Sequence, residues 1–195
     1  MELTRILIVE DEFIVALDIQ DRLTELGYDV VGLTDRGEEA LALVETIQPD
    51  LVLMDIRLKG SMDGITTAQV IRQRWRIPVI YLTAFSEDNT LERAKVTEPS
   101  GYIIKPFEDR EIQAAIEMAL YKHQAEQRLR ESEDSAWALL NATTDMAMLL
   151  GMDWKVLGIN EACAQAYGKP LGELVGTDIF QHMSSPLAAA RRARV

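Results

Sequence analysis

Short apolar runs alternate along the chain with longer segments whose apolar residues recur every three or four positions. The runs fall at residues 5–9, 29–33, 51–54, 79–82 and 101–104. Runs of this length are typical of buried strands, and the spacing of the intervening segments is typical of helices that cover a sheet. Strands that alternate with helices predict a parallel sheet, because neighbouring parallel strands need a crossover connection.

This pattern continues to about residue 125 and predicts an α/β domain. Helices are expected between the strands and after the last one, at residues 13–26, 37–47, 65–74, 88–96 and from about 109 onward. Right-handed crossovers with short loops would place helices on both faces of the sheet. The sequence therefore predicts a doubly wound, five-stranded parallel sheet.

The last of these helices has no stop signal. Residues 111–141 contain neither Pro nor Gly, so the helix is expected to continue as one long element. Its apolar positions are sparse between Tyr121 and Glu133, which favours a solvated helical linker over a heptad seam. A parallel dimer seam along the same helix is the alternative.

The residues after this helix predict a small second unit, because 195 residues leave room for one full domain and part of another. Residues 145–150 and 156–159 bracket a turn and are typical of a hairpin. Asn160 is placed to cap a short helix that ends near Gly168. Another turn of helix is expected at residues 171–176.

The composition is acidic, with a net charge of −12, which disfavours binding to nucleic acid or anionic lipid. The first residues lack the apolar core of a signal peptide, and no apolar run approaches the roughly 18 residues of a membrane span. The single cysteine, Cys163, cannot form an internal disulfide. These observations predict a cytoplasmic protein that binds neither nucleic acid nor membrane.

Polar side chains follow the predicted strands at the points where the strands end. Glu10 and Asp11 follow the first strand, and Asp55, Thr83 and Lys105 end the third, fourth and fifth. Because the carboxyl ends of parallel strands meet at one edge of a sheet, we expect these side chains in one pocket. Crowded carboxylates repel one another unless a cation is present, and hard oxygen ligands with room for water favour Mg²⁺.

These residue types fit the transfer of a phosphoryl group. Asp55 can attack phosphorus as a nucleophile and become an aspartyl phosphate. Mg²⁺ and Lys105 would hold phosphoryl oxygens, and the Thr83 hydroxyl would hydrogen-bond another. Taken singly, each residue has a simpler role, since acidic pairs cap helices and Lys-Pro is an ordinary turn. Packing does not require all of them at the ends of four strands.

Four stretches, ILIVEDE, LVLMDIRL followed by MDG, VIYLTAF and GYIIKPF, resemble the receiver domain of two-component response regulators in order and spacing. The resemblance covers residues 1 to about 125 and implies a flavodoxin-like sheet with strand order 2-1-3-4-5. It implies phosphorylation of Asp55, and Mg²⁺ binding by Glu10, Asp11, Asp55 and the main-chain carbonyl of Arg57. Glu10 stands where Asp is commonest in the family.

The resemblance also implies a conformational switch. Thr83 would be the switch hydroxyl, Tyr102 the rotating aromatic and Lys105 the phosphate partner, with a cis bond before Pro106. Phosphate would draw Thr83 inward and let Tyr102 fill the vacated space, which changes the face made by the fourth helix and fifth strand. The alternative interpretation is that Tyr102 is simply a half-buried aromatic residue of a strand and has no switching role.

Residues from about 132 resemble the first half of a PAS domain, in the stretches LLNATTDMAMLLGMDWKVLGINEACAQAYG and LGELVGTDIF. The strands that would complete its sheet are missing, so we expect a piece cut from a longer protein. The expected organisation is a receiver at 1–122, a helical linker at 123–134 and a partial α+β PAS domain at 135–195. Neither His182 nor Cys163 is expected to bind a cofactor.

Together these features predict a response regulator of a two-component phosphorelay that signals through a helix to a PAS sensor. Its partner would be a histidine kinase or phosphotransfer protein, and the receiver would catalyse its own phosphorylation and dephosphorylation. A parallel homodimer is expected, because receivers and PAS modules both commonly dimerise. The alternative is an N-terminal fragment of a hybrid histidine kinase, which an ATP-binding kinase region in a longer reading frame would establish.

Two other classes share part of the pattern. A phosphatase of the haloacid dehalogenase type also uses an aspartyl nucleophile and Mg²⁺, but it needs a second acid two residues later, where Arg57 stands. A flavin-binding domain of the same topology would have a loop rich in Ser, Thr and Gly after its first strand. Three acids occupy that place here, at residues 10–12.

Overall fold

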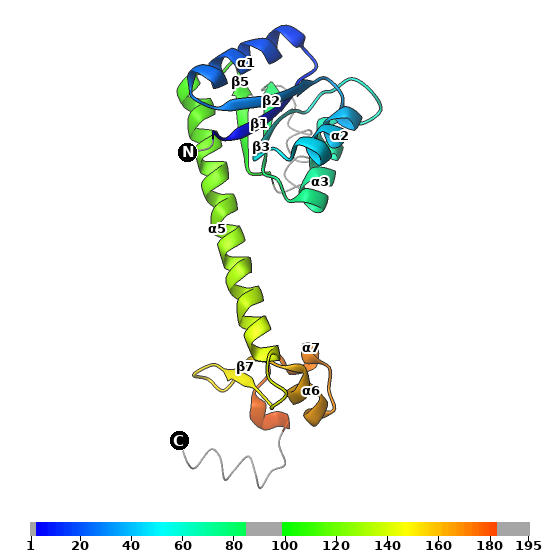
Figure 1. Cartoon of the computed structure of the whole chain (residues 1–195), viewed down its shortest axis with the longest axis vertical. Coiled ribbons are helices and arrows are strands. Elements are labelled where there is room, and N and C mark those ends of the chain that lie inside the picture. The colour runs from blue at the N-terminus through cyan, green and yellow to red at the C-terminus, as the bar shows by residue number, and fades with distance from the viewer. Residues whose placement is uncertain (1–2, 85–98, 183–195) are drawn as a thin grey trace. The chain divides into compact units, whose positions relative to one another are not determined.

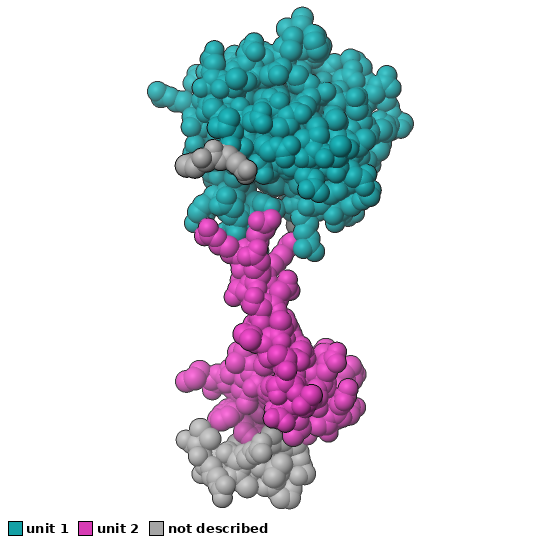
Figure 2. All heavy atoms as spheres, in the orientation of Figure 1, with its two compact units in different colours: residues 1–126 teal, residues 127–195 magenta. Residues whose placement is uncertain are grey.

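The computed structural model describes residues 3–84 and 99–182, and the chain divides into two compact units (Figure 2). Unit 1 is Met1–Glu126 and unit 2 is Gln127–Val195. The helix expected at residues 88–96 lies outside the described residues.

Unit 1 contains a five-stranded sheet in the order β2-β1-β3-β4-β5, and every pairing is parallel (Figure 1). This order confirms the predicted flavodoxin-like sheet. The strands are β1 (Arg5–Val9), β2 (Asp29–Thr34), β3 (Leu51–Asp55), β4 (Val79–Ala84) and β5 (Gly101–Lys105). Asp55 pairs in register with Leu82, and Thr83 with Ile104, so the carboxyl ends of the last three strands lie at one edge.

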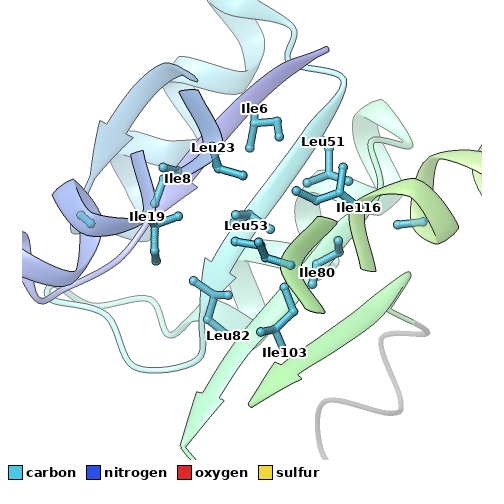
Figure 3. Packing of buried hydrophobic residues seen from close by; sticks show 13 residues of the cluster. Ile6, Ile8, Ile19, Leu23, Leu51, Leu53, Ile80, Leu82, Ile103 and Ile116 are labelled. Carbon is cyan, nitrogen blue, oxygen red and sulfur yellow. The ribbon is translucent and has the colours of Figure 1, made fainter. Parts of the chain in front are cut away.

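Helices cover both faces of this sheet, as predicted from the alternating pattern. They are α1 (Phe13–Glu25), α2 (Gly37–Ile47), α3 (Gly64–Trp75) and α5 (Asp109–Asn141). Because successive strand residues point to opposite faces, the core divides into two layers. One layer packs against α1 and α5, and its best-buried members include Ile8, Leu53, Leu82, Ile19 and Ile116 (Figure 3). The other layer packs against α2 and α3.

The ends of two helices follow local sequence signals. The carboxylate of Asp63 caps α3 by accepting a hydrogen bond from the main-chain N–H of Thr66 at 2.8 Å. α2 ends at Ile47, and its C-cap residue Gln48 adopts the left-handed conformation with φ 51° immediately before Pro49. The helix expected at residues 37–47 therefore has the bounds that were predicted.

Helix α5 continues without interruption from Asp109 to Asn141, which confirms the prediction of one long helix. Its buried residues are Ile112, Ile116 and Ala119, all of which pack in unit 1. No helix of the described residues combines the length and the apolar character needed to cross a membrane.

Unit 2 contains the predicted antiparallel hairpin of β6 (Met148–Leu150) and β7 (Val156–Ile159). The helices α6 (Glu161–Tyr167) and α7 (Leu171–Leu174) and the 3₁₀ helix η1 (Ile179–His182) follow it. Their small core includes Val156, Ile159 and Cys163. Cys163 is buried there among apolar side chains.

Asn160 joins the hairpin to α6. Its side-chain oxygen accepts hydrogen bonds from the main-chain N–H groups of Cys163 and Ala147, both at 3.0 Å. Its amide nitrogen donates to the carbonyl of Asp145 at 2.7 Å. The predicted cap of α6 is therefore present, and the same side chain also ties the start of the hairpin to the helix.

Candidate functional site

Three acids and one amine meet at the carboxyl edge of the sheet in unit 1. Glu10, Asp11 and Asp55 each offer a carboxylate oxygen, and these oxygens lie within 4.8 Å of one another. The Nζ of Lys105 donates hydrogen bonds to Glu10 Oε2 at 2.6 Å and to Asp55 Oδ2. The fold thus gathers four of the side chains that were expected to share one pocket.

The burial of these groups decides their ionisation. Burial raises the pKa of the Glu10 carboxyl to about 7, while the hydrogen bond from Lys105 opposes the rise and the Asp55 charge adds to it. Burial alone would lower the pKa of Lys105, but hydrogen bonds to Asp55 and Glu10 outweigh it and raise that pKa above its ordinary value. The amine therefore stays charged, and Glu10 binds a proton at a higher pH than an ordinary glutamate does.

The backbone around Asp55 is held in place by the loop that follows it. The main-chain N–H of Arg57 donates to Asp55 Oδ1 at 2.9 Å, and the N–H of Gly64 donates to the carbonyl of Ile56, also at 2.9 Å. Gly64 lies so close to the Asp55 carbonyl that no side chain fits there. Gly64 was not assigned a role in the site from the sequence, although it ends the MDG stretch that contributes to the resemblance.

The donor set fits a small divalent cation. The three carboxylates and the Lys105 ammonium leave two negative charges in excess when all are ionised. Such an excess is unfavourable at the rim of a protein core unless a cation offsets it. Carboxylate oxygens that leave room for water are the ligands that Mg²⁺ prefers. Glu10, Asp11 and Asp55 are therefore suitable ligands for this ion.

Two further residues of the expected site lie on the neighbouring strands. Thr83 is buried near the end of β4, and Tyr102 is half-buried in β5 with its ring centroid 5.8 Å from that of Tyr81. The bond between Lys105 and Pro106 is cis, as predicted. The expected switch face also includes the segment at 88–96, which lies outside the described residues.

The family described as "Response regulator receiver domain" matches residues 6–117, which include the whole acidic pocket. The chain belongs to this receiver family. The match covers the sheet and its helices and ends within α5.

Curated relatives of the receiver are regulatory proteins. "Transcriptional regulatory protein PdtaR" of Mycobacterium tuberculosis is 40% identical over 116 residues, which are 60% of this chain and 56% of that protein. "Phyllosphere-induced regulator PhyR" of Methylorubrum extorquens is 34% identical over 134 residues, 68% of this chain and 49% of that protein. The chain thus spans about half the length of the curated relatives it matches.

Solved structures of receivers have the same fold. The signal receiver domain of a modulated diguanylate cyclase from Desulfovibrio desulfuricans G20 is similar with a TM-score of 0.62 and 38% identity, over 64% of this chain and 99% of that one. The N-terminal domain of a "response regulator/sensory box/GGDEF 3-domain protein" from Carboxydothermus hydrogenoformans is similar with a TM-score of 0.58 and 37% identity. The match covers 63% of this chain and 98% of that one.

Proposed function

We propose that this chain is a phosphorelay response regulator whose receiver accepts a phosphoryl group on Asp55 from a histidine kinase or phosphotransfer protein. The observation that carries the proposal is the pair of hydrogen bonds from Lys105 to Glu10 and Asp55, beside Asp11. An amine held against a carboxylate nucleophile is placed to receive the negative oxygens of a phosphoryl group as the group arrives.

The transfer exchanges one bond for another. An oxygen of Asp55 attacks phosphorus and forms the new O–P bond, while the N–P bond of the donor phosphohistidine breaks and its imidazole nitrogen takes up a proton. Lys105 would leave its carboxylate partners and contact a phosphoryl oxygen, and Thr83 would hydrogen-bond another. Mg²⁺, held by Glu10, Asp11, Asp55 and the Arg57 carbonyl, would neutralise phosphoryl charge.

The surface beside the pocket supports a protein as the donor. Phe13 and Ile14 begin α1, directly after the acids at residues 10–12, and are 70% and 82% exposed. Neighbouring exposed apolar side chains form a surface on which a protein partner can pack. A histidine-bearing helix that docks on them would bring its phosphohistidine within reach of Asp55.

We also propose that phosphorylation shifts a population of receiver conformations through Thr83 and Tyr102. The buried position of Thr83 and the half-buried ring of Tyr102 on the adjacent strand support this role. A phosphoryl group that binds the Thr83 hydroxyl better in one conformation will populate that conformation, because a ligand shifts an equilibrium only by its difference in affinity.

The output part of the proposal concerns unit 2. Residues 123–134 would be the linker helix, and residues 135–195 would be the first part of a PAS sensor in a cytoplasmic homodimer. The hairpin followed by the Asn160-capped helix supports this assignment. The Carboxydothermus hydrogenoformans protein offers a parallel, since its name places a sensory box after a response regulator part.

The proposal is tested by intact mass spectrometry after incubation with Mg²⁺ and acetyl phosphate. We expect the mass of one phosphoryl group on the wild-type chain, none after chelation of Mg²⁺, and none on Asp55→Asn. Asp18→Asn is the matched control, because Asp18 is an exposed acid of α1 that pairs with Arg22 outside the pocket. A phosphorylated Asp55→Asn variant would contradict the proposal.

A further inference from the structure

Helix α5 carries an exposed apolar stripe in addition to the face that packs on the sheet. Met118, Leu129 and Leu139 are 73%, 61% and 75% exposed, and Ala125 and Ala136 between them are exposed as well. The α5 stripe, as we call it, consists of Met118, Lys122, Ala125, Leu129, Ser132, Ala136 and Leu139. Five of its seven members are apolar.

The members of the α5 stripe are separated alternately by four and three residues. This is the spacing of the a and d positions of a heptad, with Leu129 at a and Ser132 at d. The packed residues of the helix, Ile112 and Ile116, lie on a different face. The sequence pattern looked sparse because it combined positions from both faces, and burial separates them.

The middle of α5 has little else to stabilise it. Every residue from 124 to 139 is exposed, so this length of helix buries no side chain within the chain as described. Helical segments of about 15 residues are marginal in water without packing, and most of their stability in proteins comes from an apolar face that is covered. A cover over the α5 stripe would provide that stability.

We propose that the α5 stripe is the seam of a parallel, two-stranded coiled coil between two copies of this chain. The inference gives the proposed homodimer its contact surface, and it rests on that part of the proposed function. It does not rest on the phosphorylation chemistry, which involves other residues.

The charges beside the stripe favour a second copy in parallel orientation. In a parallel pair in register, Arg128 at position g lies beside Glu133 at position e of the second copy, which is a pair of opposite charges. An antiparallel pair would instead bring e positions together and set Glu126 against Glu133.

Lys122 is the one charged member of the stripe. It occupies an a position, where a single Lys sets the register at a cost in stability. Its Nζ lies 3.9 Å from Glu126 Oε1 one turn later on the same helix, so its charge has a partner at the edge of the seam. The stripe therefore specifies register as well as association.

The first test is mass measured by light scattering across a range of concentrations for the full chain. We expect a dimer, and we expect Leu129→Glu to raise its dissociation constant by about a hundredfold or more, because two carboxylates would meet in a dry seam. Gln127→Glu places the same charge outside the stripe and should leave the dimer intact. A monomeric wild type, or a dimer that Leu129→Glu does not weaken, would overturn the proposal.

The second test is disulfide formation in a Cys163→Ala background. Ser132→Cys puts thiols at a d position and should cross-link two copies, whereas Asp134→Cys at position f should not. Cross-linking of both variants, or of neither, would count against a parallel seam. Uptake of phosphate from acetyl phosphate separates the two proposals. A monomeric Leu129→Glu variant that is phosphorylated supports both, and a wild-type dimer that never takes phosphate contradicts only the receiver chemistry.

Discussion

A side chain at Gly64 would collide with the main chain of Asp55. A Cβ placed there would lie 2.9 Å from the carbonyl carbon of Asp55 and 3.0 Å from Ile56 Cα, with the Asp55 oxygen closer still. These atoms belong to the end of β3 and its following residue, so they cannot rotate away. The first residue of α3 therefore helps to set the position of Asp55.

Gly64→Ala should consequently disturb the pocket without changing any of its polar groups. We expect a loss of about 2 kcal/mol in the free energy of unfolding and about a tenfold slower uptake of phosphate from acetyl phosphate, because the backbone must shift. Gly172→Ala is the matched control, since a Cβ at Gly172 meets nothing within 4 Å. Equal rates for Gly64→Ala and wild type would show that this close contact does not control the site.

The raised pKa of Glu10 predicts a pH dependence of Mg²⁺ binding. Mg²⁺ would bind the carboxylate form, so below a pKa of about 7 the ion would have to displace a proton from Glu10. Affinity should therefore fall as pH falls below 7, by up to about tenfold per pH unit. Calorimetric titration with Mg²⁺ at several pH values, in two buffers of different ionisation enthalpy, measures both the affinity and the released proton.

The same pKa predicts the sign of a stability change in the metal-free protein. Because the pKa of Glu10 in the folded chain lies above its ordinary value of 4.5, the folded state binds this proton more tightly than the unfolded state does. Its contribution to stability is present below about pH 4.5 and is lost as pH rises towards 7. Glu10→Gln should make the melting temperature depend less on pH over that range. An unchanged dependence of the melting temperature on pH in this variant would contradict the raised pKa of Glu10.

Lys105→Gln should separate cation binding from phosphoryl transfer. Removing the ammonium takes a positive charge away from Glu10 and Asp55, so Mg²⁺ should bind more tightly. Phosphate uptake should slow on the order of a hundredfold, because a group placed to stabilise the transferred charge is lost. Lys59→Gln is the control, since the ion pair of Lys59 is with Asp35, which is not one of the three pocket acids. Weaker Mg²⁺ binding in Lys105→Gln would contradict this reasoning.

Asn160→Ala should loosen unit 2. The substitution removes the acceptor of two main-chain N–H groups and the donor to the Asp145 carbonyl, at a cost of about 3 kcal/mol. Asn141→Ala, at an exposed amide that accepts one hydrogen bond from Glu161, should cost less than about 1 kcal/mol. Hydrogen exchange of peptides from residues 147–167 measures the loss of stability in each variant. Similar protection in the two variants would argue against a special role for Asn160.

The fold was predictable because the strands of unit 1 are short apolar runs, and the sheet buries nearly all of β1, β3 and β4. Leu51, Val52, Leu53 and Met54 have no exposed surface, and their approach to Asp55 was enough to place this acid at the edge of the sheet. The positions of Glu10 and Lys105 followed from the same rule. The positions of the strand ends alone thus predicted that these three side chains lie at one edge of the sheet.

The contacts inside the pocket could not be predicted from the positions of the strand ends. The hydrogen bond from Lys105 to Glu10 depends on the rotamers of two long side chains, and the raised pKa of Glu10 depends on how deeply it is buried. Periodicity alone also could not tell which positions of α5 pack on the sheet and which, such as Leu129, face outward. These features become clear only when burial is assigned residue by residue.

The most direct test of the central claim is to locate the phosphoryl group. The chain would be phosphorylated with acetyl phosphate and Mg²⁺, reduced with borohydride, which converts an aspartyl phosphate to homoserine, and digested for tandem mass spectrometry. We expect homoserine at position 55 and unmodified carboxylic acids at Glu10 and Asp11. Modification at another acid, with Asp55 unchanged, would contradict it.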